Sequence, residues 1–239
     1  MGGRPFAAAL ARWAEQVGIG AAQVPPGDST ALAARPPTGE HRLASWERRH
    51  GFRLPRALRL WLKISDGLYH GQAPLIHPLA SIGPMIPFAR VPELVVQPES
   101  WFELGNPGGE TLCIDLGYRR PDGDCPLFAS GDDERGTRPR LIAPGFEAWF
   151  LRLVAEGGRT YWLDPEFPTL GDPWVEHRRH APPPALPARL RHLTVRVRPL
   201  MRPGADERRI ADDLGISRGD VEALFRHLQH AAPGCWPPG

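Results

Sequence analysis

A short helix whose start and end can both be read from the sequence constrains the fold most. Pro55 stands at its first position, where the missing N–H of proline costs no hydrogen bond. Leu58, Trp61 and Leu62 follow at helical spacing and form one apolar stripe. Gly67 closes the block, since glycine readily adopts the left-handed conformation that ends helices. The block therefore predicts a core helix that packs against other elements.

Composition is compatible with a globular chain that contains several long connections. Of the 239 residues, 41% are hydrophobic, while 29 prolines and 26 glycines indicate loops and linkers. The formal net charge is only +2, so the chain as a whole does not resemble a polyanion-binding protein. One stretch is unbalanced, because residues 177–205 contain seven arginines, three histidines and no acid.

The cysteines and the apolar runs exclude several classes of protein. Cys113, Cys125 and Cys235 lack the spacing of zinc ligands and leave one cysteine unpaired, which argues against a disulfide framework. The N-terminal apolar run is too short for a secretory signal, and no run approaches the roughly 18 residues of a membrane helix. We therefore expect a cytoplasmic protein that does not associate with membranes.

Changes in composition divide the chain into three parts. Residues 1–39 are expected to form an amphipathic helix followed by a linker rich in proline, glycine and alanine. Residues 40–180 should form the main domain. Residues 181–239 begin with a proline-rich connector and should end in a smaller unit that is mainly helical.

The main domain is predicted to be α+β, with a mostly antiparallel sheet packed against helices. Residues 73–99 are proline-punctuated and should form loops with one short strand. The expected strands of the sheet are residues 101–104, 111–116, 126–129 and 140–142, with an edge strand at 161–163. An aromatic helix should follow Gly145, because Phe146, Trp149, Phe150 and Leu153 lie at helical spacing.

In their order along residues 40–159, these features resemble the SUKH superfamily, the Smi/Knr-type domain of bacterial immunity proteins and fungal cell-wall-regulator homologues. The motifs are Leu54-Pro55, Leu58 with Trp61, Ser65-Asp66-Gly67, His77-Pro78-Leu79, Trp101-x3-Gly105, Gly109-x2-Leu112-x-Ile114-Asp115, Pro126-Leu127 and Phe146-Glu147-Ala148-Trp149-Phe150. The family usually has Asn-Gly where this chain has Asp66-Gly67. The resemblance implies an α+β domain that binds proteins, in bacteria most often by neutralising a cognate toxin, and it implies no catalytic residues.

Two residues of the main domain are candidates for contact with a partner protein. Asp115 ends an apolar strand on the face opposite Leu112 and Ile114, although an aspartate there can simply satisfy backbone donors. Trp101 lies near a turn, which makes it the tryptophan for which partial exposure is expected. The other tryptophans have the spacing of core residues.

The sequence gives no positive support for an enzyme. It contains no glycine-rich phosphate loop, no G-x-S-x-G elbow and no H-E-x-x-H motif. His177 and His180 are one helical turn apart, but no cysteine or carboxylate near them has the spacing of a metal ligand. We therefore expect no catalytic residue, no bound metal and no cofactor.

A second motif, in residues 209–224, resembles a helix-turn-helix. Gly215 occupies the turn, where a left-handed residue is needed, and apolar residues stand where the two helices would pack. In this frame Ser217, Arg218 and Arg226 would face DNA, and the preceding arginines could contact phosphates.

Two observations argue against DNA binding by this motif. Asp212, Asp213, Asp220 and Glu222 place negative charge on or beside the DNA face. Residues 194–198 alternate like a strand, so no supporting third helix is evident. The first functional expectation is therefore an immunity- or antitoxin-like protein that binds a protein, and a DNA-binding regulator is the alternative. A pI of about 8.6 argues mildly against a basic nuclease as the toxin.

Overall fold

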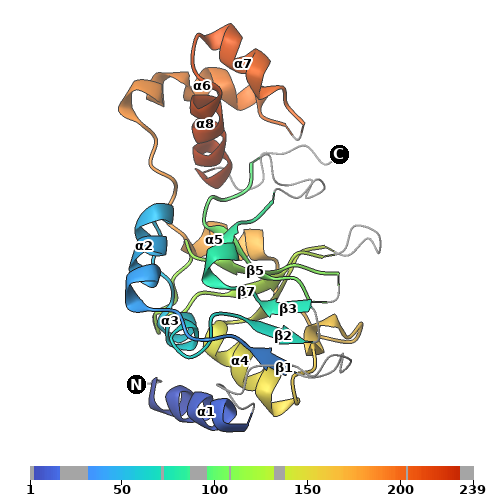
Figure 1. The fold of residues 1–239 in the computed structure, drawn as a ribbon. Coiled ribbons are helices and arrows are strands. Elements are labelled where there is room, and N and C mark those ends of the chain that lie inside the picture. The colour runs from blue at the N-terminus through green and yellow to red at the C-terminus, as the bar shows by residue number, and fades with distance from the viewer. Residues whose placement is uncertain are drawn as a thin grey trace. The chain divides into compact units, whose positions relative to one another are not determined.

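The computed structural model describes residues 3–16, 32–70, 73–86, 96–107, 109–131, 138–202 and 204–231 (Figure 1). The chain forms two compact units. The main unit comprises Met1–Met85 and Ser100–His180, and the small unit comprises Ile86–Glu99 and Ala181–Gly239. The domain predicted for residues 40–180 is therefore interrupted, because residues 86–99 group with the C-terminal part of the chain.

A five-stranded antiparallel sheet forms the centre of the main unit, which confirms the predicted α+β fold. Its strands, in spatial order, are β4 (Gly83–Pro84), β5 (Trp101–Gly105), β6 (Leu112–Asp115), β7 (Leu127–Ala129) and β8 (Arg140–Ala143). Phe102 pairs with Ile114, and Trp101 pairs with Asp115, so the two pairs point to opposite faces. Both faces are buried, which the sequence did not predict for the second one.

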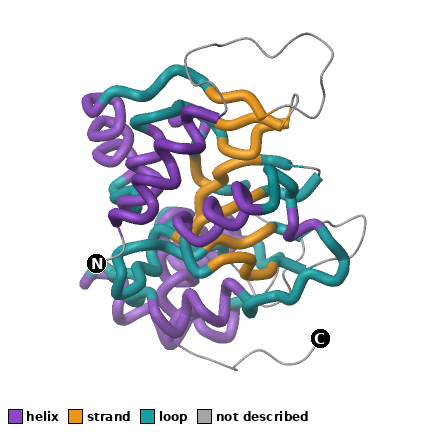
Figure 2. Tube along the Cα trace, turned by 90° about the horizontal axis from the view of Figure 1, so that it is seen from below, coloured by secondary structure: helices purple, strands orange, loops and turns teal. Residues whose placement is uncertain are grey.

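A three-stranded sheet lies beside the larger one, and the strands of both run through the main unit in Figure 2. It consists of β1 (Leu32–Ala34), β2 (Leu68–His70) and β3 (Ala73–Ile76). The predicted linker thus contributes a strand, and the described part of residues 73–99 contains two strands rather than one, β3 and β4. The sheets are joined where the His77 N–H donates to the Leu104 carbonyl at 2.5 Å and the Asn106 N–H donates to the Pro74 carbonyl at 2.8 Å.

Two consecutive helices connect β1 to β2. Helix α2 (Glu40–His50) ends at Gly51 in the left-handed conformation. Helix α3 (Arg56–Leu62) is shorter than predicted, because Pro55 is its N-cap and Lys63 its C-cap. Gly67, with a φ of 118°, serves the turn before β2 instead of ending the helix.

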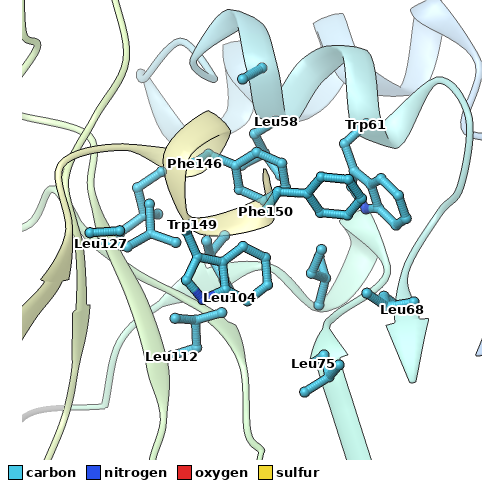
Figure 3. Close-up of a cluster of buried hydrophobic side chains, with 14 of the residues drawn as sticks. Leu58, Trp61, Leu68, Leu75, Leu104, Leu112, Leu127, Phe146, Trp149 and Phe150 are labelled. Carbon is cyan, nitrogen blue, oxygen red and sulfur yellow. The ribbon is translucent and has the colours of Figure 1, made fainter. Parts of the chain in front are cut away.

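The main core lies between one face of the sheets and helices α3 and α4 (Phe146–Ala155), as Figure 3 shows. The Trp61 and Phe150 rings are 4.8 Å apart between centroids, and Trp13 of α1 (Gly3–Gln16) packs 4.8 Å from Trp61. Phe6 and Leu10 of α1 are also fully buried. The predicted amphipathic helix therefore belongs to this core. The helix end expected at Gly18 and Gly20 lies outside the described residues.

Two further helices of the main unit differ from expectation. Residues predicted as an edge strand form a 3₁₀ helix, η2 (Tyr161–Leu163), whose Tyr161 and Trp162 pack into the main core. A one-turn helix suits this short segment because it buries both neighbouring aromatic side chains in the same core. Helix α5 (Pro173–His180) follows and packs Trp174 and His177 against the second face of the large sheet. This helix is the reason that the second face is buried.

The small unit is helical and has a hydrophobic core of its own. Its elements are η3 (Ala188–Leu193), α6 (Thr194–Val197), η4 (Arg198–Leu200), α7 (Glu207–Leu214) and α8 (Arg218–Ala231). The strand-like interpretation of residues 194–198 was wrong. Leu190, Leu193, Val197 and Met201 are buried at intervals of three or four residues, so helical packing overrides the local alternation.

Candidate functional site

Asp115 is the centre of a buried polar cluster on the second face of the large sheet. Its side chain is 3% exposed. Its Oδ1 accepts hydrogen bonds from the Ser100 hydroxyl at 2.8 Å and from the Gly117 and Tyr118 N–H groups at 2.9 and 3.3 Å. Its Oδ2 lies 2.6 Å from Nδ1 of His177. The cluster therefore ties the end of β6 to the chain before β5 and to α5.

The order of the three side chains determines what this cluster can do. An activated serine needs a histidine next to its hydroxyl as the base. Here the Asp115 carboxylate stands between Ser100 and His177 and binds both. Gly117 permits the arrangement, because a Cβ there would lie 2.6 Å from the Ser100 hydroxyl oxygen. The geometry is that of a structural link between strand and helix.

Trp101 is buried, which corrects the expectation of partial exposure. It is 1% exposed and packs 4.8 Å from the Phe128 ring, with the His177 ring at 6.2 Å edge-on. Asp115 is buried as well, and the partner-binding role predicted for the two residues stays a prediction. The physical reason for the burial is α5, which covers the face that both residues occupy.

Helix α5 has a start signal that the sequence analysis missed. The Asp172 carboxylate accepts hydrogen bonds from the Trp174 and Val175 N–H groups at 2.7 and 3.0 Å, which caps the first turn. Pro173 occupies the first helical position. The Asp-Pro-Trp sequence could therefore have predicted this helix.

The two histidines of α5 have structural contacts. His177 binds Asp115, while the His180 ring stacks on Tyr118 with a centroid distance of 4.4 Å. Nε2 of His180 also lies 3.2 Å from the Glu176 carboxylate. Across the residues that the structure describes, no three metal-binding side chains gather into a site.

A cavity of about 380 Å³ opens between α1, α3, α4 and the turn at residues 120–124. Its volume falls within the range of small-ligand and side-chain pockets. Its apolar walls include Phe6, Leu60 and Leu151. Its charged groups are Arg56, Arg120, Asp122, Asp124 and Glu147. The sequence did not indicate this cavity, because it is assembled from four separate segments.

Asp124 shapes one wall of this cavity by capping α4. Its Oδ2 accepts the Glu147 N–H at 3.0 Å and its Oδ1 accepts the Cys125 N–H at 2.9 Å. Burial raises the pKa of Asp124, and the backbone hydrogen bonds oppose that rise. Gly145 makes room for the carboxylate, because a Cβ there would lie 2.4 Å from Oδ2. Asp124 thus replaces the cap side chain that glycine cannot supply.

The remaining charged groups of the cavity are available to a partner in different degrees. Arg120 Nε lies 3.4 Å from the Asp122 carboxylate, so these two charges largely compensate each other. Burial, followed by the nearby charges of Asp124 and Asp122, raises the pKa of Glu147. Arg56 opposes this rise, so Glu147 stands near two acids and one arginine above apolar walls. This arrangement suits a side chain with an apolar stem and a cationic head.

The three residues predicted to face DNA lie in the small unit. Ser217 and Asp220 cap α8 reciprocally: the Ser217 hydroxyl accepts the Asp220 N–H at 3.1 Å, and the Asp220 carboxylate accepts the Ser217 N–H at 3.3 Å. Nε of Arg218 lies 2.9 Å from Glu207 and 3.2 Å from Glu222.

Arg226 is also paired with acids. Its guanidinium lies 3.1 Å from Glu222 and 2.6 Å from Glu99. Glu222, one of the four acids noted in the sequence, thus pairs with both arginines that were expected to approach DNA. Gly215 does adopt the left-handed conformation between α7 and α8, with a φ of 66°.

Asp220 offers a pH-dependent test of the small unit. A hydrogen bond from Arg189 is the main cause that lowers the pKa of Asp220 to about 2. A depressed pKa stabilises the fold above the unfolded value of 3.8, and this contribution is lost as the pH falls through about 2. In Arg189→Gln, an NMR titration of the Asp220 carboxyl should move its pKa back toward 3.8. An unchanged titration would contradict the assigned ion pair.

A comparison of the chain with models of protein families gave no match, and a search of curated proteins found no similar sequence. Among the helices of the described ranges, none has the length and apolarity required to cross a membrane.

Proposed function

We propose that this chain is a non-catalytic, cytoplasmic protein-binding module, an immunity- or antitoxin-like protein of the SUKH type that neutralises a cognate toxin. The observation that carries the proposal is the way the resembling segments form one core. The core contains residues of the helix with Leu58 and Trp61 and of the helix that begins at Phe146. The hairpin that begins at Trp101 belongs to the sheet against which this core packs. The three segments follow one another in the order that the resemblance implies.

The cavity beside α4 is the proposed point of partner contact. Its apolar walls can bury the stem of an inserted side chain, and each buried CH₂ group is worth about 0.8 kcal/mol. Glu147 can pair with a cationic head in a partly desolvated position, where charge pairs give specificity. A toxin surface with a protruding lysine or arginine would fit this site, and steric cover of the toxin would follow from docking.

The test uses any toxin-domain protein that is found to be encoded beside this chain. Co-expression should protect cells from the toxin and yield a stable complex. Glu147→Arg should weaken the complex by at least about tenfold, equivalent to 1.4 kcal/mol, because it places a cation opposite a cation. Glu166→Arg is the matched control, since Glu166 is exposed and lies outside the cavity.

Thermal unfolding of both variants separates docking from folding. If the native chain gives neither protection nor a complex, the immunity proposal is wrong. If Glu147→Arg and Glu166→Arg bind the toxin equally well with unchanged unfolding, the cavity is not the contact point.

The alternative function is a DNA-binding regulator that uses α7 and α8. The left-handed Gly215 turn and the burial of Ile210, Val221 and Leu224 between the helices support it. The ion pairs of Arg218 and Arg226 argue against α8 as the surface that reads DNA. Arg218→Gln in the full chain tests this version, because a recognition helix would lose affinity with that change.

A further inference from the structure

The small unit exposes a group of arginines that have no acidic partner among its described residues. They are Arg191, Arg196, Arg198 and Arg202. Arg208 and Arg209 on α7 are exposed and also have no acidic partner in the described part of the unit, whereas its three other described arginines are paired. Arg189 pairs with Asp220 at 2.7 Å, and Arg218 and Arg226 pair with glutamates. Within the described part of the unit, four of the six guanidinium groups without an acidic partner therefore lie on residues 188–202.

Local structure arranges these arginines along one continuous helical segment. The segment consists of η3, α6 and η4, and it buries Leu190, Leu193 and Val197 in the core of the small unit. Arg191 and Arg198 lie seven residues apart and share one exposed side. With rises of about 1.5 Å per α-helical and 2.0 Å per 3₁₀ residue, the segment is roughly 24 Å long. That length matches about seven base pairs of duplex.

The surroundings leave this positive charge uncompensated. Residues 177–205 contain no acid at all. Asp220, Glu222, Glu207 and Glu99 are occupied by the arginines of α8 and by Arg189. The remaining acids of the described small unit, Asp206, Asp212 and Asp213, lie on α7 or at its start.

We propose that residues 188–202 bind the phosphate backbone of nucleic acid without sequence preference. This proposal goes beyond the protein-binding function and uses a different surface from the recognition helix of the alternative function. Guanidinium groups bind phosphate oxygens bidentately. The exposed apolar residues of the segment are Val195 and Leu200, and it presents no aromatic anchor of the kind that dominates protein interfaces. Phosphate is therefore the occupant that fits better than an acidic protein.

The experiment measures binding of the full chain to two unrelated DNA duplexes of about 24 base pairs by fluorescence anisotropy. Both duplexes should bind with similar affinity. Four phosphate contacts predict a slope of about −3.6 for log K against log salt, or a loss of about 150-fold between 50 and 200 mM. The triple variant Arg191→Gln/Arg196→Gln/Arg198→Gln should bind at least about tenfold more weakly at 50 mM and reduce the slope to about −0.9.

Two control variants separate binding by this surface from an effect of net charge and from a contribution of α8. Arg48→Gln/Arg49→Gln/Arg53→Gln removes the same net charge from exposed residues of the main unit and should leave binding unchanged. Arg218→Gln should also have no effect, because Arg218 is already paired. Circular dichroism of each variant verifies that the helices remain folded.

The proposal is overturned by several results. No binding at 50 mM salt would reject it, and so would a strong preference for one duplex. Equal losses in the two triple variants would show that only net charge matters. A polyglutamate peptide of matched charge that binds as tightly as DNA would assign the surface to acidic proteins instead. Toxin binding by the triple variant is measured separately. A failure of the nucleic-acid proposal can therefore be distinguished from a failure of the immunity proposal.

Discussion

Replacing Asp115 with alanine should destabilise the main unit by about 3 to 5 kcal/mol. The change removes the shared acceptor of Ser100, Gly117 and His177, and all of its polar partners would be left in a largely dry environment. Loss of the link between β6 and α5 should also expose the sheet face that carries Trp101. The effect should therefore exceed that of a single lost hydrogen bond.

Denaturant unfolding followed by tryptophan fluorescence measures this loss, because the seven tryptophans in the described residues all belong to the main unit. Glu166→Ala is the control and should change the free energy of unfolding by less than about 0.5 kcal/mol. Asp115→Asn retains one carbonyl acceptor, so its loss in free energy of unfolding should lie between those of Asp115→Ala and Glu166→Ala. A loss below about 1 kcal/mol in Asp115→Ala, the net worth of one ordinary hydrogen bond, would show that the cluster does not hold α5.

Gly105→Ala is expected to lower the free energy of unfolding by about 3 kcal/mol, because the added methyl group has no room. A Cβ at this position would lie 2.3 Å from the Leu75 carbonyl oxygen and 2.8 Å from that of Pro74. These atoms are backbone, so no side chain can move aside to relieve the clash. The two sheets would have to separate at the hydrogen bonds made by His77 and Asn106.

Gly83→Ala is the matched control for this glycine. Gly83 also lies in a strand of the main unit, but a Cβ there would meet no atom within 4 Å. The free energy of unfolding of Gly83→Ala should differ from that of the native chain by less than about 0.5 kcal/mol. Equal stability of the two variants would contradict the close approach of β3 and β5.

The parts of the fold that the sequence predicted correctly are those with strong local signals. Helix α4 has four aromatic or aliphatic residues at helical spacing, and β5 and β6 flank a glycine-rich turn. Helix α3 was placed correctly, but its end was not. The residues after Leu62 form a turn in which the Ser65 hydroxyl donates to the Gly67 carbonyl, so Gly67 is needed for the path into β2.

The errors occur where distant residues decide the structure. Asp115 was singled out correctly as an unusual carboxylate, but its partner His177 is 62 positions away, and no local pattern connects them. The sequence neighbours of Trp101 are those of an exposed residue near a turn. It is buried because α5, which lies far away in the sequence, packs against it. The cavity combines a residue of α1 with residues of α3, α4 and a turn, so composition and spacing could not reveal it.

The interrupted main unit has a consequence for the order in which the protein can be assembled during synthesis. The Val96 N–H donates to the Gln229 side chain at 3.1 Å across 133 positions, and Glu99 pairs with Arg226. Residues 96–99 therefore cannot complete their contacts until α8 has left the ribosome. The main unit can therefore be synthesised completely before this segment has its partners, and truncation at residue 180 would remove Gln229 and Arg226, which bind it.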